Sequence, residues 1–182
     1  VFLDEYTTAG TYTLNTVNLP TTASGANNAL ISDGTAIDEG ELTLSTDGGY
    51  LVLSGYGSTI PAGVPLSTST SALINRVVGT VDYTEVVNTT TSLTDWGNLG
   101  TPRSAVSVDG SAFWLGSDVD GVRYTTLGST TTTSISTTNT DINQVNIFGG
   151  QLMASSATGL IRLGTVGSGL PITGPQILAN LP

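Results

Sequence analysis

The sequence repeats one short pattern three times, and this repeat restricts the fold more than any other feature. Each copy is an alternating apolar and polar run, a glycine-containing turn, and a second apolar run. The copies are Glu41–Ser45 with Tyr50–Ser54, Ala105–Val108 with Ala112–Leu115, and Gln144–Phe148 with Gln151–Ala154. Alternate side chains of a strand lie on opposite faces of a sheet, and Asp-Gly or Gly-Gly suits a tight turn. The pattern therefore predicts three antiparallel β-hairpins.

One further apolar strand follows each hairpin, at Asn75–Val81, Gly121–Thr125 and Gly159–Leu163. No segment has a sustained period of about 3.6 residues with capping residues, so we expect no helix longer than a turn. Sheets of a few short antiparallel strands, repeated at intervals of roughly 40–60 residues, are typical of β-propeller blades. We therefore predict an all-β, β-propeller-like fold.

The repeats divide the chain into parts of a single partial propeller domain, 1–182. We predict outer strands over 1–20, blades over 27–93 and 103–138, a partial blade over 143–165, and a Gly/Pro-rich tail over 166–182. That is about three and a half blades, whereas a closed ring needs roughly 4–8. An open ring exposes blade faces and strand edges to water. We therefore expect a second copy of the chain, or a complementary C-terminal propeller half, to complete the ring.

The alternation also predicts which side chains are buried between blades. The large apolar residues of the hairpins share one face of each strand, and hydroxyl or amide residues point the other way, towards polar groups or solvent. The predicted buried set is Leu42, Leu44, Leu51, Leu53, Val106, Val108, Phe113, Leu115, Val145, Ile147 and Leu152, and the opposite set is Thr43, Ser45, Ser107 and Asn146.

Composition excludes most catalytic chemistry. The chain has 32 Thr and 19 Ser but no Lys, His or Cys. It therefore lacks the residues of Ser–His–Asp and Cys–His nucleophile systems, of Schiff bases and P-loops, and of the usual zinc, haem and iron–sulfur sites. We predict that the protein is not an enzyme, has no catalytic residues, and binds no transition-metal cofactor.

Charge and hydropathy restrict the partners and the location. The formal net charge is −10, which repels nucleic acid and anionic membranes. No apolar run approaches the roughly 18 residues of a membrane-spanning segment, so we expect no membrane insertion. Only 10% of residues are charged, and hydroxyl groups replace charges as the solubilising groups of the surface. This composition favours a secreted or cell-surface protein.

Five long segments cover most of the chain: Val1–Pro20, Ser24–Gly57, Asn75–Asp82, Arg103–Gly128 and Asn143–Pro171. These segments resemble a family of bacterial secreted, Thr/Ser/Gly-rich, β-propeller-like proteins. The resemblance implies that the chain is similar to the N-terminal half of such a propeller. The family carries no catalytic motif to transfer, so the resemblance implies a fold and a location without a mechanism.

Two groups of carboxylates are candidates for cation binding or catalysis. Asp118 and Asp120, followed by Gly121, resemble the start of a calcium loop, in which alternating carboxylates surround a hard cation. No later acidic ligand follows at the required spacing, and a turn between two strands is the favoured interpretation. Asp38 and Glu39, with Glu41, would suit a cation or an acid–base pair. As the solvated start of a strand they need no function, and we favour that interpretation.

Trp96 is the candidate for binding a glycan. It lies in a predicted loop with Asp95 and Asn98, and an aromatic ring with neighbouring polar groups can stack on a sugar and bond its hydroxyls. Hydrophobic packing of the same ring is the favoured alternative. The four arginines, Arg76, Arg103, Arg123 and Arg162, are expected to pair with carboxylates or backbone carbonyls.

Three function classes remain. The leading one is a non-enzymatic extracellular or cell-surface protein with a structural or adhesive role, as part of a larger assembly. The first alternative is a carbohydrate-binding module that uses the loop aromatic residue Trp96. The second is a polysaccharide-active enzyme that uses carboxylates such as Asp38 and Glu39.

Overall fold

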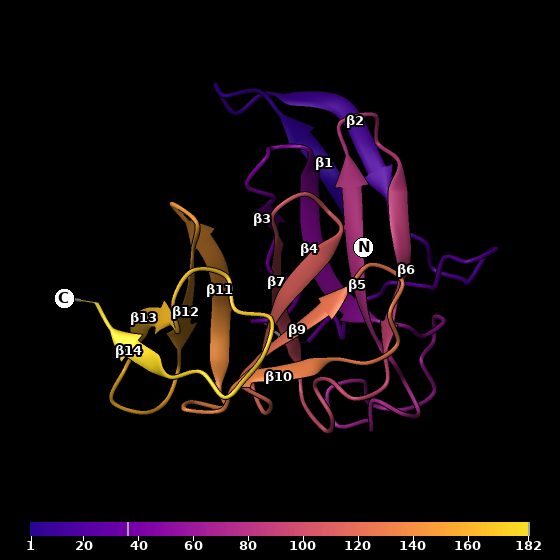
Figure 1. The fold of residues 1–182 in the computed structure, drawn as a ribbon. Helices are drawn as coiled ribbons and strands as arrows, with labels where there is room; N and C mark the ends of the chain where they lie inside the picture. The colour runs from indigo at the N-terminus through magenta and orange to yellow at the C-terminus, as the bar shows by residue number, and fades with distance from the viewer. Residues whose placement is uncertain (36, 182) are drawn as a thin grey trace.

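The computed structural model describes residues 1–35 and 37–181. Ala36 and Pro182, which fall in the predicted segments 27–93 and 166–182, lie outside the described residues. The described chain is all-β: it forms fourteen strands in four antiparallel sheets, and none of its residues is helical (Figure 1). A search of these residues for a helix long and apolar enough to cross a membrane finds none. The predicted all-β class is confirmed.

The sheets follow one another in chain order. An N-terminal hairpin is followed by a first, a second and a third four-stranded sheet, and within each four-stranded sheet every strand pairs with the next one along the chain. The hairpin contains β1 (Phe2–Tyr6) and β2 (Tyr12–Asn18), and the first sheet contains β3 (Thr43–Leu44), β4 (Tyr50–Tyr56), β5 (Arg76–Asp82) and β6 (Val87–Leu93). The second sheet contains β7 (Pro102–Ser107), β8 (Ala112–Ser117), β9 (Val122–Thr126) and β10 (Thr133–Ser136). The third sheet contains β11 (Ile142–Phe148), β12 (Gln151–Ser156), β13 (Leu163–Val166) and β14 (Leu178–Asn180).

All three predicted hairpins are present, as β3–β4, β7–β8 and β11–β12. In two of these hairpin turns, an aspartate side chain accepts a hydrogen bond from the backbone N–H two residues later. In the first, Asp47 accepts a backbone N–H bond from Gly49 at 2.9 Å, and in the second Asp109 accepts one from Ser111 at 3.0 Å. The glycine that follows each aspartate has a positive φ, 75° at Gly48 and 80° at Gly110, which only glycine adopts without strain.

The third sheet has one strand more than the sequence predicts. The predicted partial blade ends at residue 165, and 166–182 is predicted to be a tail. In the structure, β13 ends at Val166 and β14, within the predicted tail, pairs with it in antiparallel register. The strand is only three residues long, too short for an alternation to be visible, and it is held there because Leu178 is buried in the core.

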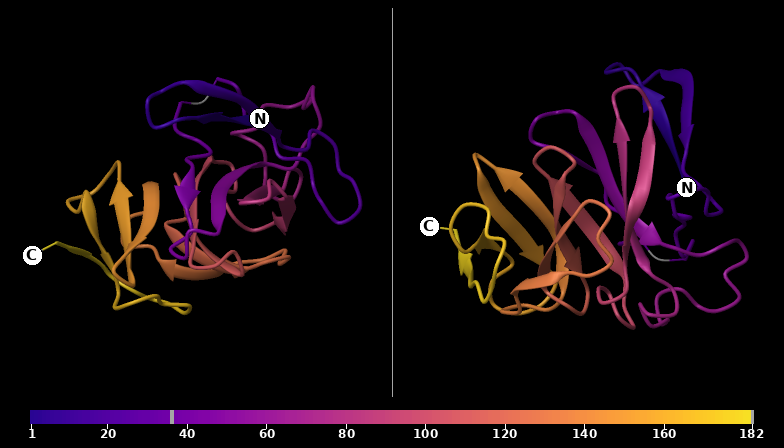
Figure 2. Two further views of the ribbon diagram at one scale, coloured as in Figure 1. Left: turned by 90° about the horizontal axis from the view of Figure 1, so that it is seen from above. Right: turned by 45° about the vertical axis from the view of Figure 1, so that its right-hand side comes forward.

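Successive sheets pack face to face through their first strands. Strands β3 and β4 contact β7, and β7 and β8 contact β11. Figures 1 and 2 show the sheets side by side, with the N-terminal hairpin at one end and the third sheet at the other. The described sheets form an open row and do not close into a barrel or ring.

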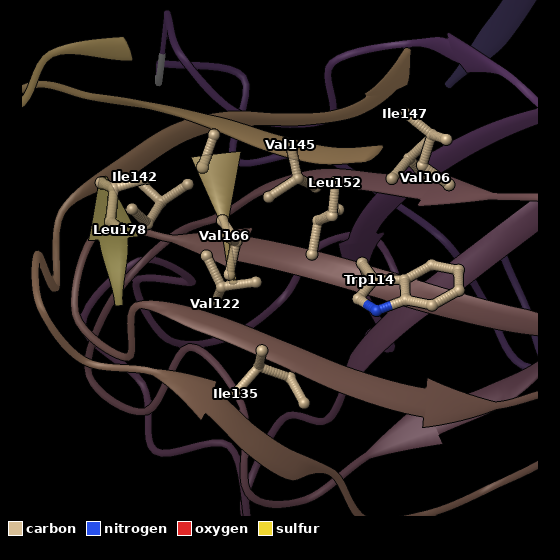
Figure 3. Packing of buried hydrophobic residues seen from close by; sticks show 11 residues of the cluster. Val106, Trp114, Val122, Ile135, Ile142, Val145, Ile147, Leu152, Val166 and Leu178 are labelled. Atoms are coloured by element: carbon tan, nitrogen blue, oxygen red, sulfur yellow. The ribbon is translucent and has the colours of Figure 1, made fainter. Parts of the chain in front are cut away.

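Apolar clusters fill the spaces between sheets. The largest lies between the second and third sheets (Figure 3), where Trp114 and Val122 face Val145 and Leu152. The Trp114 indole N–H donates to the backbone oxygen of Pro171 at 2.7 Å. A second cluster joins the first and second sheets, and a third joins the segment that follows β2 to the first sheet. Each four-stranded sheet therefore has at least one face covered by a neighbour.

Seven of the eleven predicted core residues are buried: Leu53, Val106, Phe113, Leu115, Val145, Ile147 and Leu152. Leu51 and Val108 are half-buried. The prediction for Leu42 and Leu44 is wrong, because they are 48% and 56% exposed, whereas Thr43 and Ser45 between and beside them are buried. The alternation is present, but the hydroxyl face rather than the leucine face of this strand packs against the second sheet.

Phe113 provides a test of the packing between the first and second sheets. Its ring is fully buried, so we expect Phe113→Ala to lower the free energy of unfolding by about 3–5 kcal/mol, because truncation leaves a cavity. Chemical denaturation measures the change. Thr131→Ala is the control, since Thr131 is exposed and surface positions change stability by less than about 0.5 kcal/mol. Equal effects of the two substitutions would contradict this packing.

Candidate functional site

Arg103 connects three parts of the chain. It lies at the start of β7, and its guanidinium contacts Asp38 Oδ2 at 2.7 Å, Asp141 Oδ1 at 2.5 Å and Asn143 Oδ1 at 2.5 Å. Asp38 lies in the segment before the first sheet, whereas Asp141 and Asn143 lie at the start of the third sheet. The Arg103 side chain is only 10% exposed, so the ion pairs are shielded from water on the arginine side. Asp38, a candidate acid–base residue, is thereby an ion-pair partner.

The other two carboxylates of the Asp38 group have different neighbours. Glu39 accepts a short hydrogen bond from the Asp33 backbone N–H, and its Oε2 is buried with no hydrogen-bond partner among the described residues. Burial raises the pKa of Glu39, and burial also raises the pKa of Glu41, because the charged form loses hydration. The three carboxylates therefore do not converge on a shared partner.

A buried arginine lies close to Glu39. Arg76 is fully buried, and its guanidinium lies 4.8 Å from the centre of the Tyr56 ring. It donates hydrogen bonds to the backbone oxygens of Ser69 at 2.8 Å and Gly100 at 3.0 Å. Burial lowers the pKa of Arg76 and raises that of Tyr56. Arg76 thus organises loops beneath the first sheet, as expected for an arginine paired with carbonyls.

The predicted calcium ligands bind backbone groups. Asp118 Oδ1 accepts a hydrogen bond from the Thr101 N–H at 2.6 Å, and Asp120 accepts a short one from the Gly97 N–H. Both carboxylates thereby hold the loop between β6 and β7. Within residues 1–35 and 37–181, no three acidic, His or Cys side chains are grouped so that they could hold a metal ion. Calcium binding at Asp118 and Asp120 stays an untested prediction.

Trp96 is not available for sugar stacking in this structure. Its side chain has no exposed area and packs in the cluster between the first and second sheets. Asp95 accepts a bond from the Thr132 backbone N–H at 3.0 Å and lies 3.6 Å from Arg123, and Asn98 accepts a bond from the Ser71 N–H at 3.1 Å. The predicted glycan-binding residues are therefore occupied with internal contacts, and the packing alternative is confirmed for Trp96.

The structure places a groove at a site that the sequence did not indicate. The groove lies between the N-terminal hairpin and the first sheet and has a volume of about 370 Å³. Apolar side chains and carboxylates both line it: Leu3, Val17, Leu51 and Val81, and Asp4, Glu5, Asp82 and Glu85. Asn15 Nδ2 bridges the two walls by donating to Glu85 Oε1 at 2.7 Å.

A second, smaller hollow adjoins the groove along the first strands of the first sheet. This hollow of about 120 Å³ is lined by Leu44, Leu51 and Val81, and the last two also line the groove. Leu42, which precedes β3, is 48% exposed, and Leu44 is 56% exposed. We call Leu42 and Leu44 the leucine face. It lies on the side of the first sheet opposite to β7.

The groove carboxylates are held in place by neighbouring hydroxyl and backbone groups. Asp4 Oδ1 accepts a bond from Thr16 Oγ1 at 2.6 Å, and Glu5 Oε2 accepts one from Thr13 Oγ1 at 2.8 Å. Hydrogen bonds from Thr84 and Val86 lower the pKa of Asp82. None of the described residues that line the groove is an arginine. The groove therefore combines an apolar floor with a fixed, uncompensated negative rim.

Comparison of the chain with protein-family models, with curated protein sequences and with solved structures finds no match.

The raised pKa of Glu39 predicts a pH-dependent effect of its substitution. A folded-state pKa above the usual value of 4.5 means that protonated Glu39 stabilises the fold at low pH, and that this contribution is lost as the pH rises through the folded-state pKa. Glu39→Gln removes the charge and keeps an oxygen for the Asp33 N–H. We expect the variant's Tm to equal or exceed that of the wild type at pH 7, and the difference to be smaller at about pH 4. Thermal unfolding at both pH values measures this, and a variant that is equally destabilised at both would contradict it.

The contacts of Arg103 predict that its substitution lowers the free energy of unfolding. Replacing it with Met leaves Asp141 and Asn143 without their partner, and we expect a loss of about 1–3 kcal/mol in the free energy of unfolding. Arg162→Met is the matched control, because Arg162 is exposed and its loss should cost less than about 0.5 kcal/mol. Urea denaturation compares the two. If Arg103→Met were as harmless as the control, Arg103 would not be holding the sheets together.

Proposed function

We propose that the protein is a non-enzymatic, extracellular structural or adhesive module of β-propeller type, whose ring is completed by a partner. The observation that carries this proposal is the repeated packing of successive four-stranded sheets. Each sheet is an antiparallel meander, and the first strands of one sheet pack on those of the next. Propeller blades pack on their neighbours through the same kind of face-to-face contact.

The exposed apolar residues at the two ends of the row of sheets support the proposal that a partner completes the ring. At one end, the N-terminal hairpin and the segment that follows it pack on the outer face of the first sheet, but Leu42 and Leu44 remain exposed. At the other end, the third sheet exposes Phe148 and Leu163. Uncovered sheet faces of this kind are interaction sites or aggregation hazards. A partner that covers both ends removes the hazard.

Composition supports an extracellular, non-catalytic role. The chain has no His, Lys or Cys, and Asp38, the acid considered for polysaccharide hydrolysis, is ion-paired with Arg103. Buried hydroxyls such as Thr43 bond across sheets, at 2.6 Å to the Ala105 backbone oxygen, so the Thr/Ser richness serves the core as well as the surface. No specific observation favours the enzymatic alternative.

The assembly is directly measurable. We expect purified protein to form a complex of at least twice the 18.5 kDa chain mass, or to bind a complementary β-rich partner, with a buried interface above roughly 2,000 Å². Size-exclusion chromatography with light scattering gives the mass. A monodisperse monomer that unfolds cooperatively and binds no such partner would contradict the proposal.

The carbohydrate-binding alternative now depends on other aromatic residues. Tyr83 at the rim of the groove is 89% exposed, and Tyr6 is 59% exposed. A glycan array with the wild type and Tyr83→Ala separates the two functions. Glycan binding that is lost in Tyr83→Ala would favour the carbohydrate-binding module, whereas the structural proposal expects no specific glycan signal.

A further inference from the structure

We infer that a hollow between the first and second sheets binds a short aliphatic diamine, a ligand with two ammonium groups joined by an apolar chain. The hollow has a volume of about 290 Å³ and lies at the end of the two sheets where the turn between β7 and β8 is found. We call it the inter-sheet hollow. The inference goes beyond the proposed function and does not depend on the completion of a ring.

Each sheet supplies one wall of the inter-sheet hollow. Tyr50, Thr80 and Asp82 line it from the first sheet, and Asp109 lines it from the turn between β7 and β8. Tyr50 pairs with Asp82, and Thr80 pairs with Val52, which is buried in the cluster shared with the second sheet. Paired residues, and alternate residues of one strand, share a face of a sheet. The three side chains therefore point towards the second sheet.

The hydroxyl of Thr80 indicates that the hollow accepts a polar group. Thr80 is only 4% exposed, whereas Asp109 is exposed, so Thr80 lies deeper in the hollow. Its hydroxyl makes no hydrogen bond with the described residues. Buried hydroxyls ordinarily have a partner, and Thr43, on the same face of the sheet, donates to the Ala105 backbone oxygen at 2.6 Å. The Thr80 hydroxyl is therefore available to a group that enters the hollow.

Both walls carry an ionised carboxylate. Asp82 Oδ1 accepts a hydrogen bond from the Thr84 N–H at 2.8 Å, and Asp109 Oδ1 accepts one from the Ser111 N–H at 3.0 Å. Hydrogen bonds from the hydroxyls of Thr84 and Ser111, and from backbone N–H groups, lower the pKa of Asp82 and Asp109. Both groups are therefore charged at neutral pH. Their Oδ2 atoms accept no hydrogen bond from the described residues and are available to a ligand.

An organic cation fits these groups better than an anion or a metal ion. None of the described residues that line the hollow is an arginine, and the chain has no lysine, so the two charges are uncompensated. Among the described residues, no three acidic, His or Cys side chains are grouped to hold a metal ion. An ammonium group needs only one carboxylate for a charge-assisted hydrogen bond. One carboxylate on each wall therefore suits a ligand with two ammonium groups.

Apolar surface in the hollow suits the chain that joins the ammonium groups. The half-buried Tyr50 ring lines the hollow together with Leu127. A side-chain carbon added at Gly110 would lie 3.0 Å from Cδ2 and Cε2 of Tyr50, so the ring lies directly against the turn that carries Asp109. Tyr50 thereby connects the two walls, and a methylene chain between the two carboxylates can pack on its ring.

The spacing of Thr80 and Asp82 suits one of the ammonium groups. Their Cα atoms are about 7 Å apart, because they are two residues apart along a strand. A nitrogen between the two side chains can therefore donate to Thr80 Oγ1 and Asp82 Oδ2, since an ammonium group has three N–H donors. The second ammonium group pairs with Asp109. The volume of about 290 Å³ is close to that of the smallest ligand pockets, roughly 300 Å³, which suits a short free diamine.

The test measures binding of diaminopentane to the full chain by isothermal titration calorimetry. Aminopentane, with one ammonium group, and pentanediol, with none, are the matched ligands. We expect diaminopentane to bind at least about tenfold more tightly than aminopentane, or about 1.4 kcal/mol, and pentanediol not to bind. The affinity should fall with added salt, because Asp109 is exposed and its charge is screened. Absence of saturable diamine binding, or equal affinities for the diamine and aminopentane, would overturn the inference.

Three protein variants locate the site. Asp109→Asn should weaken diaminopentane binding at least about tenfold. Asp47→Asn is the matched control, because Asp47 has the corresponding role in the turn of the first hairpin and does not line the hollow. Thr80→Val should weaken binding at least about threefold and leave the Tm unchanged or higher, because the hydroxyl has no partner in the fold. Thermal melting shows that the variants are folded. Equal effects of the two aspartate substitutions, or full binding by Thr80→Val, would contradict the assigned site.

A peptide with two lysines separates a free diamine from the lysine side chains of a polypeptide, which carry the same ammonium groups. We expect the peptide to bind more weakly than diaminopentane, because its backbone does not fit within about 290 Å³. Tighter binding of the peptide would overturn the assignment to a free diamine.

Discussion

The fold depends on hydrogen bonds made by hydroxyl groups that are buried between sheets. Thr43 and Ser54 of the first sheet donate to backbone oxygens of β7, and Ser104 of β7 accepts from the backbone N–H of Val145 in the third sheet. A buried hydroxyl without a partner costs free energy, whereas a bonded one fixes the distance and register between two sheets. A chain with more than a quarter Thr and Ser can therefore build a packed core.

Two of the four arginines make buried contacts between distant segments. Arg103 joins three segments through Asp38, Asp141 and Asn143, and Arg76 satisfies loop carbonyls beneath the first sheet. Because the chain has only four arginines and no lysine, cations used for internal contacts are not available at the surface. Among the described residues, the groove carboxylates consequently have no arginine beside them.

Leu42 and Leu44 are exposed for the same reason that Thr43 and Ser45 are buried. Packing of the first sheet on β7 uses the face that carries Thr43, since that face supplies the donors for the β7 carbonyls. Leu42 and Leu44 then lie away from β7 and remain exposed, whereas Leu53 and Val81 of the same sheet are buried against the segment that follows β2. The exposure of Leu42 and Leu44 thus follows from which face of the first sheet packs on β7.

The sequence by itself determined the all-β class, the three hairpins and their turns, because period-two alternation and Asp-Gly or Gly-Gly turns are local properties. It also determined which residues share a face, as Leu42 with Leu44. Only the tertiary structure decided which face is covered, that Trp96 is buried, that Asp118 and Asp120 hold a backbone loop, and that residues near Leu178 form a strand. Those outcomes depend on segments distant in sequence, and alternation within one strand contains no information about the neighbour that covers it.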